Sequence, residues 1–138
     1  MPPRAVRLET IADVGRDGHA RRISISGRHE AVLDDGSRVI LLDERGWTEE
    51  LRGPGADEVS DIWVGASEDD IARTARDIVG PDEPYGDRSQ EHMADGHWAT
   101  LAEMLRAQGV STDAEALRRL PHDVVLSDRL RGRIGSNA

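Results

Sequence analysis

The chain has 138 residues, of which 18 are basic and 27 acidic, so its formal charge at pH 7 is −9. Every basic residue is an arginine, and cysteine and phenylalanine are absent. Without cysteine there are no disulfides, thiolate nucleophiles or zinc–thiolate fingers. Without lysine there is no Schiff base and no phosphate-binding loop that ends in Lys-Ser/Thr. The length predicts a single domain over residues 1–138, with frayed ends at 1–4 and 135–138.

Charge and hydropathy also limit the partners. A strongly negative chain repels phosphate, so we expect no nucleic-acid partner. No apolar run approaches the roughly 20 residues of a membrane span, and no charged-then-apolar signal segment opens the chain, so we expect a cytoplasmic protein without membrane contact. Arginine, alanine, glycine and aspartate have G/C-rich codons, so the composition is typical of a high-GC bacterial genome, with salt adaptation as the alternative explanation.

The first half of the chain predicts strands, because apolar residues alternate with polar ones and glycine-containing breaks separate the runs. The expected strands cover residues 5–14, 20–26, 30–34, 38–43 and 61–65. Asp35-Gly36 predicts the tight turn of a hairpin, since these residues tolerate positive φ angles. The apolar run Val39–Leu42 is continuous, which predicts a central position for its strand.

The second half predicts helices. Hydroxyl-bearing caps open three of them and glycine or proline ends them: Ser67 to Gly80-Pro81, Ser89 to Gly109, and Thr112 to Pro121. We expect Gly80 to form a left-handed cap. Residues 123–134 fit either a short edge strand followed by a helix or one continuous helix, and we favour the helix. Strands followed by helices predict an α+β domain: an antiparallel sheet of about four to five strands in 5–65, covered by three to four helices in 67–134.

The catalytic candidates lie in the segment 91–97. His92 and Asp95 are three positions apart and share a helix face, and an imidazole beside a carboxylate is suited to proton transfer. His97 is about 140° around the helix from His92, so one metal ion cannot bind both rings on a regular helix. We therefore expect no metal site, and a solvated helix surface is the plainer alternative. Gly96 within this helix suggests a close backbone contact or a kink.

Two further segments, 45–59 and 80–89, combine an aromatic residue with carboxylates. The expected partner-binding residues are Trp47, Glu49, Glu50, Asp82, Glu83, Tyr85 and Asp87. The alternative for Tyr85 is packing on the core, and for Trp47 a helical turn that plugs the sheet. Neither segment has the ligand spacing of a calcium loop, and the chain has neither a dinucleotide motif nor a nucleophile elbow, so no cofactor is expected.

The leading hypothesis is a non-catalytic protein–protein interaction module, such as an immunity or antitoxin-type inhibitor whose acidic loops bind a basic partner. The alternative is a small enzyme or ligand-binding protein with a pocket between sheet and helices. That pocket would use His92, Asp95 or His97 together with Tyr85. Under either hypothesis we expect a monomer or a small homo-oligomer.

Overall fold

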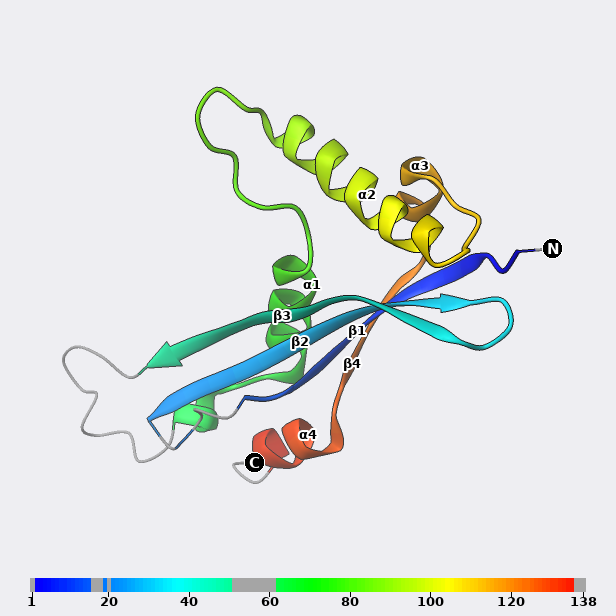
Figure 1. The fold of residues 1–138 in the computed structure, drawn as a ribbon. Coiled ribbons are helices and arrows are strands. Elements are labelled where there is room, and N and C mark those ends of the chain that lie inside the picture. Colours follow the sequence, from blue (N-terminus) through cyan, green and yellow to red (C-terminus); the bar gives the residue numbers. More distant parts are fainter. Residues whose placement is uncertain (1, 16–18, 20, 51–61, 136–138) are drawn as a thin grey trace.

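The computed structural model describes residues 2–15, 19, 21–50 and 62–135. Within them, a four-stranded sheet is combined with helices that come mostly from the C-terminal half, so the predicted α+β class is confirmed (Figure 1). The elements in chain order are β1 (Ala5–Val14), β2 (Arg22–Leu33), β3 (Arg38–Glu50), the 3₁₀ helix η2 (Ile62–Gly65), α1 (Glu68–Ile78), α2 (Gln90–Ala107), α3 (Ala114–Arg118), β4 (His122–Leu126) and α4 (Asp128–Gly135).

The sheet is mixed, not purely antiparallel, and its strand order is β3-β2-β1-β4. β1 pairs antiparallel with β2 and β2 with β3, whereas β4 lies parallel to β1. β4 comes from residues that we expected to be helical. Its burial alternates, with Leu126 buried and Val125 exposed, as in a strand with one face on the core. Helix α4 begins only after it, where the backbone N–H of Leu130 donates to Ser127 Oγ.

β2 is one continuous strand where we expected two, because the chain stays extended through Gly27. The irregularity lies in β3: Gly27 pairs with Arg45, His29 with Leu42 and Glu30 with Ile40, so β3 has two extra residues opposite β2. Such bulges interrupt the regular alternation of side chains between the two faces of the sheet. Val39, Leu41 and Leu42 all pack against the same buried cluster, so the apolar run in β3 does not require burial on both faces.

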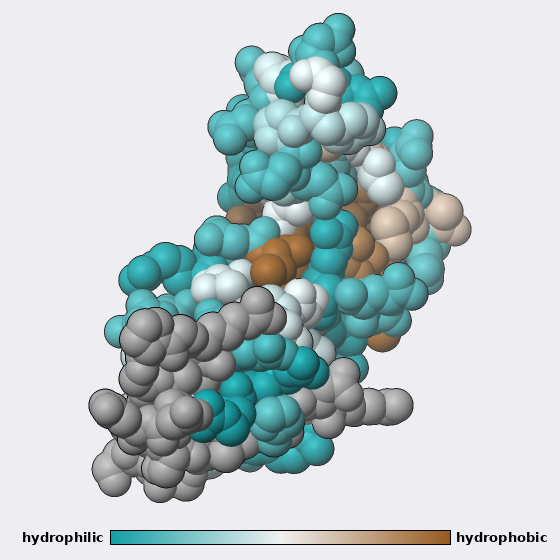
Figure 2. Space-filling view, turned by 90° about the vertical axis from the view of Figure 1, so that its left-hand side faces the viewer, coloured by the Kyte–Doolittle hydropathy of each residue, from teal (hydrophilic) through white to brown (hydrophobic). Residues whose placement is uncertain are grey.

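β3 is one of the two edge strands of the described sheet, so the prediction of a central position is wrong. Ile40 of this strand is 48% exposed. The strand continues to Glu50, so part of the expected irregular segment 45–59 is strand and the remainder lies outside the described residues. Figure 2 views the molecule from the side on which β3 ends and shows apolar side chains reaching the surface in the middle of this side.

The helix caps are largely as expected. Ser67 Oγ accepts from the N–H of Asp70 and Ser89 Oγ from the N–H of His92, both at 3.1 Å. Gly109 has φ +83°, which suits its position after α2. Helix α3 is instead capped by Asp113, one residue after the expected Thr112. None of the described helices has the length and hydropathy needed to span a membrane.

Two other local predictions differ from the structure. Gly80 has no positive φ, because the end of α1 is closed by ordinary right-handed turns. Residues 62–65 form the 3₁₀ helix η2, not a strand. Of the two ends that we expected to fray, residues 3 and 4 hydrogen-bond to Ser111 and Asp34, and residue 135 belongs to α4. Residues 1 and 136–138 lie outside the described residues.

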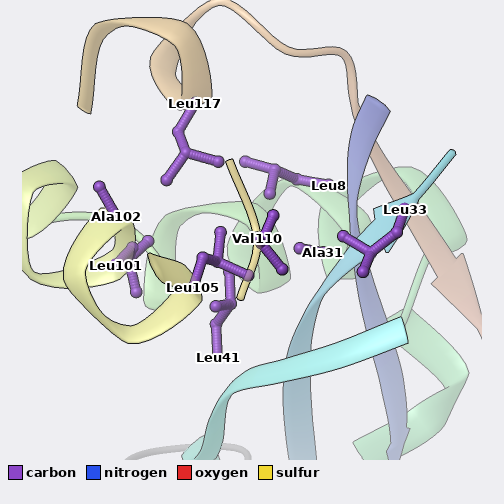
Figure 3. Close-up of a cluster of buried hydrophobic side chains, with 9 residues drawn as sticks. All are labelled: Leu8, Ala31, Leu33, Leu41, Leu101, Ala102, Leu105, Val110 and Leu117. Atoms are coloured by element: carbon purple, nitrogen blue, oxygen red, sulfur yellow. The ribbon is translucent and has the colours of Figure 1, made fainter. Parts of the chain in front are cut away.

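One face of the sheet carries two separate groups of buried apolar side chains. The upper cluster joins β1–β3 to α2 and α3 (Figure 3), and the lower cluster joins the opposite end of the strands to η2, α1 and α4. The upper cluster consists of Leu8, Ala31, Leu33, Leu41, Leu101, Ala102, Leu105, Val110 and Leu117. The lower cluster consists of Ala12, Ile23, Ile25, Trp63, Ile71, Ala75, Leu126 and Leu130.

Candidate functional site

A cleft of about 360 Å³ lies between β3, the connection from α1 to α2, and α2 itself. Its lining combines apolar side chains with charged and titratable ones that are up to 62 positions apart in the sequence. The lining residues are Leu42, Arg45, Asp82, Tyr85, Arg88, His92, Met93, Gly96, His97, Thr100, Leu101 and Met104. The cleft therefore brings together residues from all three segments that we singled out as functional candidates.

Two arginines interact with the connection between α1 and α2. Arg45 Nη1 on β3 lies 3.1 Å from Asp82 Oδ1, which ties the start of this connection to the sheet. The guanidinium of Arg88 lies over the ring of Tyr85, 4.3 Å from its centroid. Tyr85 is nonetheless 61% exposed, so it does not pack on the core as the plainer alternative required. A largely exposed aromatic side chain beside a cleft is available for contact with a ligand or partner.

The structure places two of the three catalytic candidates together. His92 and His97 both line the cleft, although they point about 140° apart around α2. Asp95 does not join them: it lies on the other side of the helix, where its Oδ1 is 3.4 Å from Nη1 of Arg118. A His92–Asp95 pair is therefore not formed. None of the described residues hydrogen-bonds to the imidazole of His92 or to Nε2 of His97.

His97 is half-buried, and its Nε2 is shielded from solvent without a hydrogen-bond partner among the described residues. Burial lowers the pKa of its imidazole below the ordinary 6.5, and the positive charge of Arg45 lowers it further, while Asp82 acts in the opposite direction. His97 is consequently neutral at pH 7. A neutral ring with an unused nitrogen can donate or accept one additional hydrogen bond.

Gly96 is explained neither by tight packing nor by an unusual backbone angle. A Cβ atom built at this position would meet nothing within 4 Å, so the close backbone contact, one of the two alternatives that we considered, is absent. A glycine inside a helix nevertheless costs about 1 kcal/mol relative to alanine. In the folded protein, the missing side chain leaves space in the wall of the cleft.

The second feature of this side of the molecule is its charge. Residues 43–50 of β3 and residues 82–88 of the connection together contain seven acidic residues and two arginines, which is a net −5 of the chain's −9. We call these two segments the acidic surface. Both lie on the side of the molecule where β3 ends, and the Arg45–Asp82 ion pair joins them directly.

Five exposed acids of this surface form no ion pair with any described residue: Asp43, Glu44, Glu49, Glu83 and Asp87. Glu50 is already paired with Arg22 across the strands. Trp47 is half-buried and packs against the lower cluster from within β3, so it contributes to the core without forming the helical turn that we considered. The partner-binding candidates are therefore not equally free to interact.

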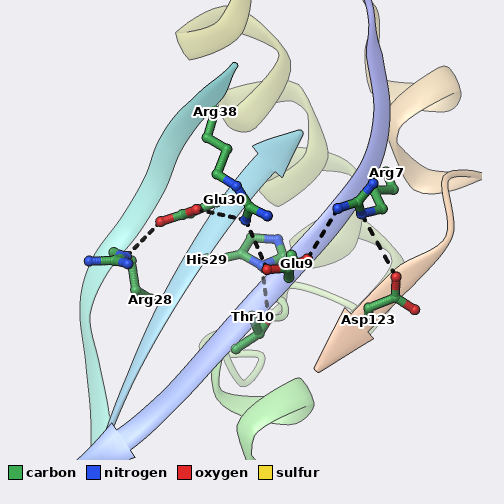
Figure 4. Close-up of polar contacts among 8 residues, drawn as sticks. All are labelled: Arg7, Glu9, Thr10, Arg28, His29, Glu30, Arg38 and Asp123. Atoms are coloured by element: carbon green, nitrogen blue, oxygen red, sulfur yellow. Dashed lines mark hydrogen bonds and ion pairs between the residues drawn. The ribbon is translucent and has the colours of Figure 1, made fainter. Parts of the chain in front are cut away.

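The opposite face of the sheet is charged but internally balanced (Figure 4). Glu9 and Glu30 face each other on β1 and β2, and Arg38 Nη1 lies 2.8 Å from the first and 3.2 Å from the second. Arg28 and Arg7 flank this pair, and Asp123 completes a row of three arginines and three acids. The hydrogen bond from Arg38 holds the pKa of Glu9 below its usual range. Because its charges cancel, this face does not contribute to the acidic surface.

A hydrogen-bonded group between the two clusters was missed by the sequence analysis. Thr10 Oγ1 lies 3.0 Å from Nδ1 of His29 and 2.6 Å from Nε2 of His122. One hydroxyl carries one proton, so it donates to one ring and accepts from the other. Burial, followed by the nearby His122 and His97, lowers the pKa of His29 from 6.5 to about 4. The sequence offered one sign of this group: the polar residues Thr10 and His29 stand at positions of β1 and β2 that point to the core.

Comparison of the chain with protein-family models, with curated proteins and with solved structures finds no match. Within residues 2–15, 19, 21–50 and 62–135, no three His, Cys, Asp or Glu side chains are placed to hold a metal ion together. Function therefore has to be inferred from the cleft and from the charges around it.

Proposed function

We propose that the protein is a non-catalytic protein–protein interaction module that binds a basic partner through its acidic surface, as an immunity or antitoxin-type inhibitor does. The observation that carries this proposal is the ion pair between Arg45 and Asp82, 3.1 Å long. It joins two acidic segments that are separated in the sequence, so their charges act as one surface. The unpaired acids on both sides of it remain free to meet positive charges on a partner.

The charge distribution supports a basic partner. More than half of the net negative charge is concentrated in two short segments, whereas the row of charges on the open sheet face is neutral. A concentrated charge of one sign speeds the encounter with an oppositely charged protein and makes the association sensitive to salt.

A second hollow, of about 550 Å³, adds a place for a basic side chain. Its lining is partly apolar and contains three carboxylates and one guanidinium, that of Arg118, which is paired with Asp95. The lining residues are Pro81, Asp82, Glu83, Pro84, Gln90, Glu91, Ala94 and Arg118. Arginine and lysine have an apolar stem and a charged end. In this hollow the stem can contact the proline and alanine side chains, and the charged end can contact a carboxylate. Tyr85 lies exposed on the same connection, and tyrosine is enriched among the residues that anchor interfaces.

A catalytic role has less support from the geometry. His92 and His97 share a cleft, but neither imidazole is oriented by a hydrogen bond to a described carboxylate. General bases normally have such an orienting partner. We therefore interpret the cleft as a binding site and assign the protein's main role to the acidic surface.

The proposal is tested by affinity capture from extracts of the native host with matched charge-reversal baits. One bait carries Glu83→Arg and Asp87→Arg on the acidic surface, and the control carries Glu115→Arg and Asp123→Arg on α3 and β4. Both changes alter the net charge equally. We expect a basic protein that the wild type and the control retain at low salt and that the surface variant loses.

Quantitative mass spectrometry of the three captures provides the measurement. Retention of the same proteins by all three baits, or a retained protein that is acidic, would contradict the proposal. Circular dichroism of each bait confirms that the substituted proteins remain folded.

A further inference from the structure

The cleft differs in charge from the surface that surrounds it. Two arginines, Arg45 and Arg88, line it against a single carboxylate, that of Asp82. In residues 43–50 of β3 and 82–88 of the connection, by contrast, acidic residues outnumber arginines. A guanidinium has five N–H donors, and the ion pair with Asp82 uses only part of those on Arg45. The lining therefore retains positive charge and hydrogen-bond donors that the described residues do not use up.

The cleft is apolar at its floor. Leu101 is buried and Leu42 half-buried, and Met93 and Met104 lie on the same side of α2. Methionine side chains are flexible and polarizable, so they adapt to ligands of different shape. The volume of about 360 Å³ is at the lower end of the range for small-molecule sites, roughly 300–1,000 Å³.

One further observation indicates that this space can hold a ligand. Gly96 leaves room in the wall of the cleft, although no neighbouring atom within 4 Å requires a glycine there. A bound molecule would fill this gap.

We propose that the cleft binds a small organic monocarboxylate with an aliphatic or aromatic body. Its carboxylate interacts with the guanidinium groups of Arg45 and Arg88, and its apolar body packs on Leu101 and Met104. Charge complementarity selects the anion, because an amine of the same shape meets two arginines. Asp82 and Tyr85 belong both to the cleft and to the acidic surface, but a ligand in the cleft leaves the unpaired acids of that surface free.

The chain offers a specific probe of this cleft. It contains three methionines, of which Met93 and Met104 line the cleft and Met1 begins the sequence. With ¹³C-methyl methionine, titration with 3-phenylpropionate is expected to shift the Met93 and Met104 signals saturably. The matched amine, 3-phenylpropylamine, is expected to bind at least about tenfold more weakly, since only the charged group differs.

Substitutions test the same site without disturbing the core. Gly96→Leu places a side chain in the open space and is expected to abolish the shifts, whereas Gly96→Ala keeps the cleft and serves as its control. Arg88→Gln is expected to weaken 3-phenylpropionate binding about fivefold or more. Arg73→Gln, an exposed arginine on α1, is the charge-matched control and is expected to leave binding unchanged. Circular dichroism verifies that each variant is folded.

Three results would overturn the proposal. The first is equal binding of the amine and the carboxylate, and the second is the absence of saturable shifts with 3-phenylpropionate up to millimolar concentration. The third is saturable binding only of a peptide that ends in a phenylalanine carboxylate, which would identify a protein terminus as the occupant. None of them bears on the capture experiment, so the two proposals fail or succeed separately.

Discussion

Protonation of His29 is expected to destabilise the fold in mildly acidic solution. His29 is 1% exposed, its Nδ1 hydrogen-bonds to Thr10, and its pKa is lowered from 6.5 to about 4. The folded state thus binds this proton less readily than the unfolded state. Stability is fully present above the unfolded pKa of 6.5 and falls as the pH decreases toward 4.

The size of the effect follows from the two pKa values. One pKa unit corresponds to about 1.4 kcal/mol, so the full difference is worth about 3 kcal/mol. Between pH 7 and pH 4.5 the linkage relation gives a loss of about 2.4 kcal/mol from His29 alone. Burial also lowers the pKa values of His97 and His122, so they act in the same direction. Hydrogen bonds from Arg38 and Arg129 lower the pKa values of Glu9 and Asp13. The stability that these two carboxylates contribute is therefore lost at a lower pH than the stability contributed by His29.

The comparison of wild type with His29→Asn isolates this contribution. The asparagine amide stands near the position of Nδ1, can still hydrogen-bond to Thr10 Oγ1 and does not titrate. The variant is expected to be less stable at pH 7, because a smaller side chain leaves a cavity. Between pH 7 and pH 4.5, however, its free energy of unfolding should fall by about 2.4 kcal/mol less than that of the wild type.

Urea unfolding followed by tryptophan fluorescence at several pH values measures both curves. Parallel curves for the two proteins would refute the reasoning, since they would mean that His29 does not change its protonation between the folded and unfolded states.

Two other substitutions test the core and the open sheet face. Leu105→Ala in the upper cluster removes a side chain that is 0% exposed and should lower the free energy of unfolding by about 3 kcal/mol in urea titration; a change below about 1 kcal/mol would contradict the assigned packing. Arg38→Gln removes the cation between Glu9 and Glu30 and should destabilise the protein at pH 7. The loss should become smaller as the pH falls through the lowered pKa of Glu9, because a protonated carboxyl group no longer requires the cation. An equal loss at neutral and at strongly acidic pH would show that the cation does not balance this carboxylate.

Local signals in the sequence predict local structure well. The caps at Ser67 and Ser89 were recognisable because a hydroxyl and the N–H three residues later are close in the chain. The turn at Gly36 was recognisable for the same reason, and this glycine has φ +86°. The separation of a strand-rich half from a helical half followed from the period of the apolar residues.

Long-range pairing was the part that the sequence could not supply. Residues 122–126 carry both a strand-like and a helix-like pattern, and their pairing with β1, more than a hundred positions away, decides between them. The bulges of β3 likewise depend on its alignment with β2. Local patterns contain no information on either.

The same distinction holds for the site. Tyr85, His92 and His97 were recognised as chemically capable residues, and the structure brings them to one cleft. Arg45 was not expected there, because its contact with Asp82 spans 37 positions. Asp95 was expected beside His92, but Arg118 from α3 pairs with it on the other side of the helix.

The most direct test of the acidic surface is to map where a basic probe binds. Titration of ¹⁵N-labelled protein with a peptide of alternating lysine and leucine, at low salt, is followed by amide chemical shifts. Shifts concentrated in residues 43–50 and 82–88 that disappear at high salt are the predicted result. Shifts centred on Glu115 and Asp123, or spread evenly over all exposed acids, would contradict the assignment of this surface as the partner-binding site.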